Sequence, residues 1–96
     1  MARRRYLITY DITDDKRRNK IFQACEREGD HTQYSVFVAE LDDRELSAML
    51  GELSDLIDAA KDQVLFADLG PAEREAGRII ASLGRPYEPM VRALVV

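Results

Sequence analysis

Residues Tyr6–Asp15 read YLITYDITDD, and the rest of the chain is organised around this stretch. Its first part is apolar, aromatic and β-branched, which is typical of a buried strand because such side chains fit a pleated, packed surface. The acidic Asp11 stands where this strand leaves the core. Thr13, Asp14 and Asp15 then offer the cap and the acidic first turn of a helix. Asp11 is thus expected on a rigid element, with its carboxylate within reach of water, a metal ion or a phosphate-bound cation.

Extended and helical patterns alternate along the following residues. The first strand is predicted over Arg5–Ile12, and a helix follows from about Asp14 to Glu28. Gly29 is expected to end this helix in a left-handed conformation. Thr32–Leu41 is extended, either as one long bent strand or as two short strands kinked near Ser35.

A second helix is predicted after Asp42, which stands at capping-box spacing from Glu45. Its apolar residues recur at the spacing of one helical face: Leu46, Met49, Leu50, Leu53, Leu56, Ile57 and Ala60. Gln63–Leu69 is a further strand. Glycines bracket Arg78–Leu83, which favours a strand there, and Met90–Val96 is a terminal strand that must be covered or paired.

This order of elements predicts an α+β fold, a ferredoxin-like βαββαβ sandwich with one antiparallel sheet and two helices on one face. We expect one domain over residues 1–96, with the core unit in residues 1–70. Residues 77–96 are expected to form C-terminal strands that act as a dimer tail, because an exposed apolar end strand pairs most simply with a second copy. The sequence therefore predicts a homodimer.

Composition and charge bound the function. The chain of 96 residues has one cysteine and no apolar run near the ~20 residues of a membrane span, so we expect a cytoplasmic protein without a membrane partner. Residues 1–20 carry seven basic and three acidic side chains, a net +4, whereas the remainder carries −8. This polarity suggests an anionic partner on one side, although a solvated helix face explains it equally well.

Asp11 is the best candidate for chemistry. Mg²⁺ prefers oxygen ligands and often accepts one or two carboxylates, so two Asp11 side chains of a symmetric dimer can share one ion. Such an ion can polarise a phosphodiester and activate water. The alternative, favoured by spacing alone, is a structural Asp11 that forms a turn or an ion pair with Arg18.

Other candidates carry weaker signals. Arg3, Arg4 and Arg5, together with Arg17, Arg18 and Lys20, can contact a phosphate backbone or simply keep the surface soluble. His31 can act as a general base or as a charge partner at a helix end. Tyr10, Tyr34 and Phe37 are interpreted as packing residues rather than base-stacking platforms, and Cys25 as core. Phosphate-binding glycine loops, Ser/His/Asp sets and zinc-ligand spacings are absent from the sequence.

Two segments together resemble a known family. YLITYDITDDKRRNKI (Tyr6–Ile21) and QYSVFVAEL (Gln33–Leu41) are similar to the small universal CRISPR-associated protein of spacer acquisition, the Cas-two family. The likeness extends through the second helix and QVLFADL, about the first seventy residues. It implies a ferredoxin-like dimer whose tail strand adds to the other subunit's sheet.

The resemblance also implies functions and residues. It implies a metal-dependent endonuclease acting on single-stranded RNA or double-stranded DNA, and a dimer that bridges two copies of the larger Cas integrase and holds spacer DNA. The metal-binding aspartate of the family falls on Asp11, with Tyr10, Arg18, Lys20, Ser35 and Phe37 at its other motif positions. Where the family often has an arginine, two places before the motif glutamine, this chain has His31.

Three hypotheses follow. In the first, Asp11 of both subunits holds Mg²⁺ for phosphodiester cleavage, and Arg18 or Lys20 stabilises the developing charge. In the second, the dimer is an adaptor whose basic groups, Arg17 included, grip nucleic acid while its tail docks the integrase. In the third, the chain is a regulatory or toxin-type domain that shares only the architecture, because a fold does not determine a function.

Overall fold

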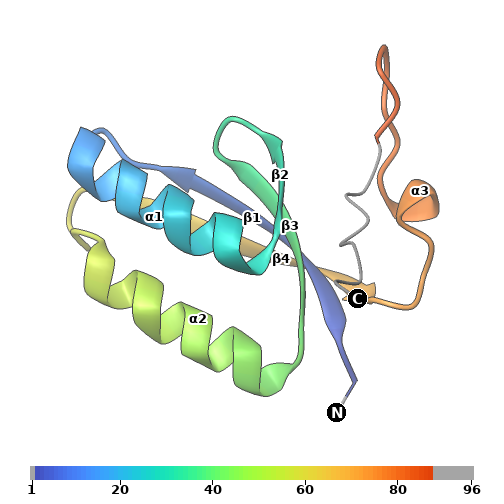
Figure 1. The fold of residues 1–96 in the computed structure, drawn as a ribbon, viewed down its shortest axis with the longest axis horizontal. Coiled ribbons are helices and arrows are strands. Elements are labelled where there is room, and N and C mark those ends of the chain that lie inside the picture. Colours follow the sequence, from blue (N-terminus) through green and yellow to red (C-terminus); the bar gives the residue numbers. More distant parts are fainter. Residues whose placement is uncertain (1, 88–96) are drawn as a thin grey trace, which may run out of the picture.

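The computed structural model describes residues 2–87, within which four strands and three helices follow in the order β1-α1-β2-β3-α2-β4-α3 (Figure 1). Their bounds are β1 Arg4–Asp11, α1 Asp15–Glu28, β2 Asp30–Gln33, β3 Val36–Leu41, α2 Asp43–Leu56, β4 Gln63–Pro71 and α3 Ala76–Ile79. The strand predicted for Met90–Val96 lies outside the described residues. Helices long and apolar enough to cross a membrane do not occur in the part of the chain that the structure describes.

The four strands form one sheet in the order β2-β3-β1-β4, and every neighbouring pair is antiparallel. At its centre, Ile8 of β1 has Phe37 of β3 on one side and Phe66 of β4 on the other. Helices α1 and α2 lie side by side on one face of this sheet (Figure 1). This is the predicted ferredoxin-like α+β arrangement, in which β1 and β2 flank β3 and are joined by α1.

The core lies between the sheet and the two long helices. Because successive side chains of a strand point to opposite faces, alternate residues of β1 and β3 reach this layer. Ile8, Ile21, Cys25 and Phe37 have no exposed surface, and burial raises the pKa of the Cys25 thiol to about 12. Met49 and Leu53 supply the buried part of the predicted apolar face of α2. Packing of α1 and α2 onto β1 therefore fixes the place where β1 ends, at Asp11.

Local capping agrees with the sequence at both long helices. Asp14 caps α1 by accepting a hydrogen bond from the Arg17 amide at 2.8 Å. Asp42 and Glu45 form the predicted capping box of α2, with reciprocal hydrogen bonds of 2.8 and 3.0 Å. These contacts satisfy amide groups that would otherwise lack partners at a helix start.

The structure corrects two predictions and decides a third. Gly29 ends α1 but is extended (φ −146°), so the expected left-handed cap is wrong. The segment near Ser35 turns, and Thr32–Leu41 belongs to two strands rather than one. The strand predicted over Arg78–Leu83 is also wrong, because the Ile80 amide bonds to the Ala76 carbonyl at 2.8 Å and closes the short helix α3.

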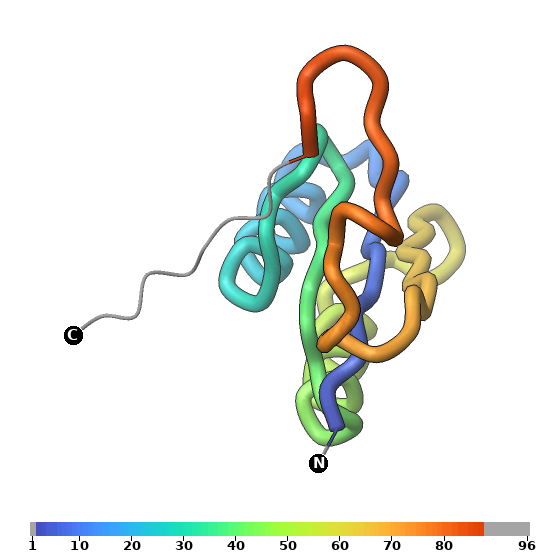
Figure 2. Tube along the Cα trace, turned by 90° about the vertical axis from the view of Figure 1, so that its right-hand side faces the viewer, coloured from blue at the N-terminus to red at the C-terminus, as the bar shows by residue number. Residues whose placement is uncertain are grey.

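Residues 72–87 leave the sheet and arch away from α1 and α2 (Figure 1, Figure 2). The buried guanidinium of Arg5 anchors the start of this arch, donating to the carbonyl oxygens of Ala72 and Arg74 at 2.9 and 2.8 Å. Gly70, with φ +99°, lies within β4 at the register shift between the Tyr6–Asp68 and Arg4–Pro71 pairs, just before the strand ends. The arch is therefore held to the N-terminal part of β1, at the opposite end of that strand from Asp11.

Candidate functional site

Asp11 is the last residue of β1, where it pairs with Gln63 of β4. Its side chain is exposed, and within residues 2–87 the carboxylate makes neither a hydrogen bond nor an ion pair. An exposed acid on a rigid strand end is held in place without being neutralised. The carboxylate is consequently available to a cation or a polar ligand.

Arg18 does not neutralise Asp11. Its guanidinium pairs with Asp15 one turn earlier on α1, and it also donates to the carbonyl oxygens of Ile12 and Thr13 at 3.1 and 3.3 Å. The alternative in which Arg18 and Asp11 form a structural ion pair is therefore wrong. Arg18 instead clamps the loop that follows Asp11, and its side chain remains 45% exposed.

A groove of about 530 Å³ brings most of the predicted site residues together. It runs between the end of β1, the first two turns of α1 and the β2–β3 turn. The predicted residues that line it are Tyr10, Asp11, Arg18, His31 and Ser35. Its other lining residues, which sequence reasoning did not assign to a site, include Asp15, Asn19, Phe22 and Tyr34. One face of α1 carries Arg18 together with Asp15, Asn19 and Phe22. Their helical spacing from Arg18 could therefore have identified these three residues as neighbours of the site.

His31 is fixed by aromatic packing and by one hydrogen bond. Its ring stacks on Phe37 with 4.8 Å between centroids, and the edge contact with Phe22 has a centroid distance of 5.0 Å. Nε2 lies 2.7 Å from the carbonyl oxygen of Tyr34, and because a carbonyl only accepts, Nε2 is the donor. That nitrogen is therefore engaged, which argues against His31 as a general base acting through Nε2.

Tyr10 and Phe37 belong to the wall behind the groove. Phe37 is fully buried, Tyr10 is 7% exposed, and their rings stack at 6.4 Å. Burial raises the pKa of the Tyr10 hydroxyl above its ordinary value, so it stays protonated near neutral pH. The Tyr10 amide donates to the Ser35 carbonyl at 3.2 Å, which ties the β2–β3 turn to β1. Both rings thus position the turn and His31.

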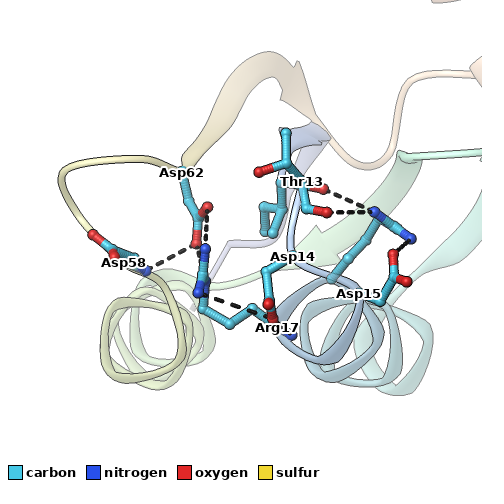
Figure 3. Close-up of polar contacts among 8 residues, drawn as sticks. Thr13, Asp14, Asp15, Arg17, Asp58 and Asp62 are labelled. Atoms are coloured by element: carbon cyan, nitrogen blue, oxygen red, sulfur yellow. Dashed lines mark hydrogen bonds and ion pairs between the residues drawn. The ribbon is translucent and has the colours of Figure 1, made fainter.

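Arg17 lies apart from the groove, in an ion-pair network between α1 and the loop before β4 (Figure 3). Its Nε donates to the side chain of Asp62 at 2.7 Å, and that carboxylate also accepts the Asp58 amide at 2.9 Å. Hydrogen bonding from Arg17 holds the pKa of Asp62 below its ordinary value. The geometry gives Arg17 a structural role, and its contact with nucleic acid stays a prediction.

Lys20 is exposed on α1 and does not line the groove. No ion pair or hydrogen bond engages its side chain within residues 2–87. The three N-terminal arginines behave differently, because Arg3 and Arg4 pair with Glu45 and Asp68, at 2.5 and 2.8 Å, and Arg5 is buried under the arch. The basic N-terminal segment of the sequence is therefore largely paired in space.

A larger cavity, about 690 Å³, lies between β2 and residues 80–87. Of the predicted site residues it contains only His31, and its single lining carboxylate, Asp30, already has an interaction partner. The smaller groove beside Asp11 is therefore a better candidate for chemistry than this cavity, since it combines the unpaired carboxylate of Asp11 with the cation Arg18 in its lining.

A metal ion fits this groove only in part. Within the described residues no group of three histidine, cysteine or acidic side chains could hold a metal. Mg²⁺ keeps several waters and often binds through one or two carboxylates, so the exposed Asp11 is a suitable but incomplete ligand set.

Comparisons with known proteins agree with this fold. The family model described as CRISPR associated protein Cas2 matches residues 4–76. The chain is 38% identical to CRISPR-associated endoribonuclease Cas2 1 of Rhodospirillum rubrum, covering 99% of this chain and 92% of that protein. It is 32% identical to CRISPR-associated endoribonuclease Cas2 of Geobacter sulfurreducens, covering 95% of each.

A solved structure gives the same fold. The crystal structure of Streptococcus pyogenes Cas2 at pH 6.5 superimposes with a TM-score of 0.73 at 27% identity, covering 83% of this chain and 99% of that one. The family match spans β1 through β4 and therefore includes the strand end that carries Asp11. The chain belongs to the CRISPR-associated Cas2 family.

Proposed function

We propose that the groove beside Asp11 cleaves phosphodiester bonds of a nucleic acid with the help of Mg²⁺ or another divalent cation. The observation that carries this proposal is the exposed, unpaired carboxylate of Asp11 beside the Arg18 cation in one groove. The names of two relatives, both endoribonucleases, support it.

Each residue of the groove has its own role in the proposed reaction. Asp11 holds the cation, which when bound would stabilise the charge that develops on the phosphodiester. Arg18, half exposed and aligned by Asp15, contacts a phosphate oxygen and favours the more negative transition state. Tyr10 and Phe37 keep the wall of the groove rigid behind them.

We also propose that two copies associate to form the complete site. The face of the sheet turned away from α1 and α2 carries Thr9 between two apolar cross-strand neighbours, Val36 and Leu65. Leu65 is 50% exposed in the single chain. A second copy would cover this apolar face and bring a second carboxylate for the cation.

Replacing Asp11→Asn tests the nuclease. We expect cleavage of single-stranded RNA or duplex DNA to fall by roughly 10²-fold or more. The neutral amide of asparagine lacks the negative charge with which the Asp11 carboxylate would bind the cation. Asp55→Asn, which removes an exposed carboxylate of α2 outside the groove, is the matched control and should cleave normally. Wild-type cleavage that persists in excess chelator would contradict the proposal.

Mixing tests the shared site. If both copies contribute Asp11, an equimolar mixture of wild type and Asp11→Asn retains about a quarter of the wild-type activity once subunits have exchanged. Independent sites would instead retain about half. If the activity of the mixture is proportional to the fraction of wild-type chains, the shared-ion arrangement is wrong, whereas the nuclease proposal still stands.

A second candidate function is the non-catalytic adaptor, which bridges the larger Cas integrase and holds spacer DNA. The observation that favours it is a pair of exposed lysines, Lys16 and Lys20, one turn apart on α1 and without ion pairs in residues 2–87. Such cations bind phosphates independently of sequence. For this function, Asp11→Asn should leave both duplex binding and spacer acquisition unchanged.

A further inference from the structure

Tyr34 is 95% exposed although its ring is large and mostly apolar. It lies in the turn between β2 and β3, and the interpretation of Tyr34 as a packing residue is wrong because the turn points its side chain out of the core. Nearby rings of Phe22, His31 and Phe37 contact one another, whereas Tyr34 contacts no ring within residues 2–87. Both faces of the Tyr34 ring are thus open to a ligand.

The backbone that carries this ring is nevertheless fixed. His31 Nε2 donates to the Tyr34 carbonyl oxygen at 2.7 Å, and the next residue, Ser35, accepts the Tyr10 amide at 3.2 Å. His31 is itself held between Phe22 and Phe37. A ring on a fixed turn loses less conformational freedom on binding than one on a mobile loop, so the turn presents Tyr34 as a preformed platform.

The platform and the candidate cleavage residue share one groove. Tyr34, Arg18 and Asp11 all line the same space of about 530 Å³. A nucleotide whose phosphate binds the Arg18 guanidinium would have its base within the same groove, where the exposed aromatic ring is Tyr34. Bases stack on tyrosine irrespective of their identity, because every base presents a π-face.

We propose that Tyr34 stacks on an unpaired base of a nucleic acid bound in this groove, and that the groove thereby prefers single strands to duplex. In a duplex both faces of each base are covered by neighbouring bases, and the edges alone are accessible. Tyr34 can then stack only after a base is extruded. This inference rests on the proposed function for the position of the phosphate, and it assigns to Tyr34 the choice of substrate and to His31 the positioning of Tyr34.

Binding without catalysis provides the test. Fluorescence anisotropy in EDTA would compare a short single-stranded RNA, the same DNA strand and the matching duplex. We expect Tyr34→Ala to weaken binding to both single strands about tenfold or more and to leave duplex affinity within about twofold. Tyr34→Phe keeps the ring and should bind as the wild type does. The matched control is Leu83→Ala, which removes an equally exposed apolar side chain outside the groove and should change nothing.

An abasic scan identifies the stacked base. At the position that Tyr34 contacts, removing the base should cost the wild type about tenfold, and Tyr34→Ala should add no further loss there. Equal losses for single strands and duplex, or additive losses at every abasic position, would overturn the proposal. A shift in association state for Tyr34→Ala, measured by sedimentation, would also overturn it by assigning the ring to an interface between copies.

The two proposals fail separately. If Asp11→Asn cleaves as well as the wild type, the nuclease proposal is lost, whereas anisotropy in EDTA still decides whether Tyr34 stacks on a base. If Tyr34→Ala binds single strands normally and Asp11→Asn is inactive, the groove is a nuclease site that selects its substrate by other contacts.

Discussion

Gly29 lies buried at the end of α1, whereas Gly51 is exposed within α2, and the fold uses the two glycines differently. A Cβ at Gly29 would lie 2.8 Å from the Val38 carbonyl oxygen and 3.0 Å from the Ala39 Cβ. Contacts below 3.0 Å force the backbone to shift, so Gly29 is required for the close approach of α1 to β3. A Cβ at Gly51 would meet nothing within 4 Å.

The two glycine-to-alanine substitutions should therefore have opposite effects on stability. We expect Gly29→Ala to lower the free energy of unfolding by about 1–3 kcal/mol, because a backbone oxygen cannot move aside freely. Gly51→Ala, on the exposed side of α2, should raise it by about 0.5–1 kcal/mol through better helix propensity. Urea titrations of both variants measure these values. Two changes of the same sign would contradict the contact seen at Gly29.

Between elements, an ion pair of Arg17 and Asp62 links α1 to the loop before β4; this link is the α1 joint. The Asp62 side chain has no exposed surface and accepts from both Arg17 and the Asp58 amide (Figure 3). The Arg17 hydrogen bond is the largest cause of the lowered pKa of Asp62. This joint orients the N-terminal half of α1, and therefore also the face of α1 that lines the groove.

The pH dependence of stability should reveal this joint. Because the pKa of Asp62 is lower in the folded than in the unfolded chain, its stabilising contribution is fully present above about pH 4 and is lost as the pH falls through the folded value. The gap in unfolding free energy between wild type and Asp62→Asn should be constant from pH 6 to 8 and shrink below about pH 4. Asp55→Asn, an exposed control, should show no gap. A gap that widens on acidification would contradict the assignment.

Local elements could be predicted from the sequence, whereas the contacts between them could not. The capping box of Asp42 and Glu45 spans three residues, so residue types alone determine it. The Arg17–Asp62 pair joins residues 45 apart, and nothing in a local pattern connects them. The place of Asp11 at the end of β1 could be predicted because a strand end is a local feature. Tyr34 was misjudged because its aromatic character favours a strand core, while the turn that exposes it follows from the pairing of β2 with β3.

At the scale of the whole molecule, the charge polarity of the sequence largely disappears. The +4 of residues 1–20 contains five arginines, and each of these pairs with an acid: Glu45 for Arg3, Asp68 for Arg4, Glu40 for Arg5, Asp62 for Arg17 and Asp15 for Arg18. The exposed pairs among these five are weak and can exchange, but together the five pairs leave little net positive field. Because the net charge is −4, the proposed binding of nucleic acid would have to rely on local cations.

Lys16 and Lys20 are the local cations best placed for this, since both are exposed, unpaired within residues 2–87 and adjacent to the groove-lining Asp15 and Asn19. If each contacts one duplex phosphate, removing both with Lys16→Gln and Lys20→Gln should reduce the slope of log K against log salt by about 1.8, because each contact releases about 0.9 counterion. Arg44→Gln, an exposed cation at the start of α2, is the control and should keep the wild-type slope. Duplex binding measured from 50 to 300 mM salt decides between the outcomes. An unchanged slope in the lysine variant, or an equal reduction in the α2 control, would show that α1 is not the phosphate-binding surface. The duplex would then have to be bound by cations of another face or of a second copy.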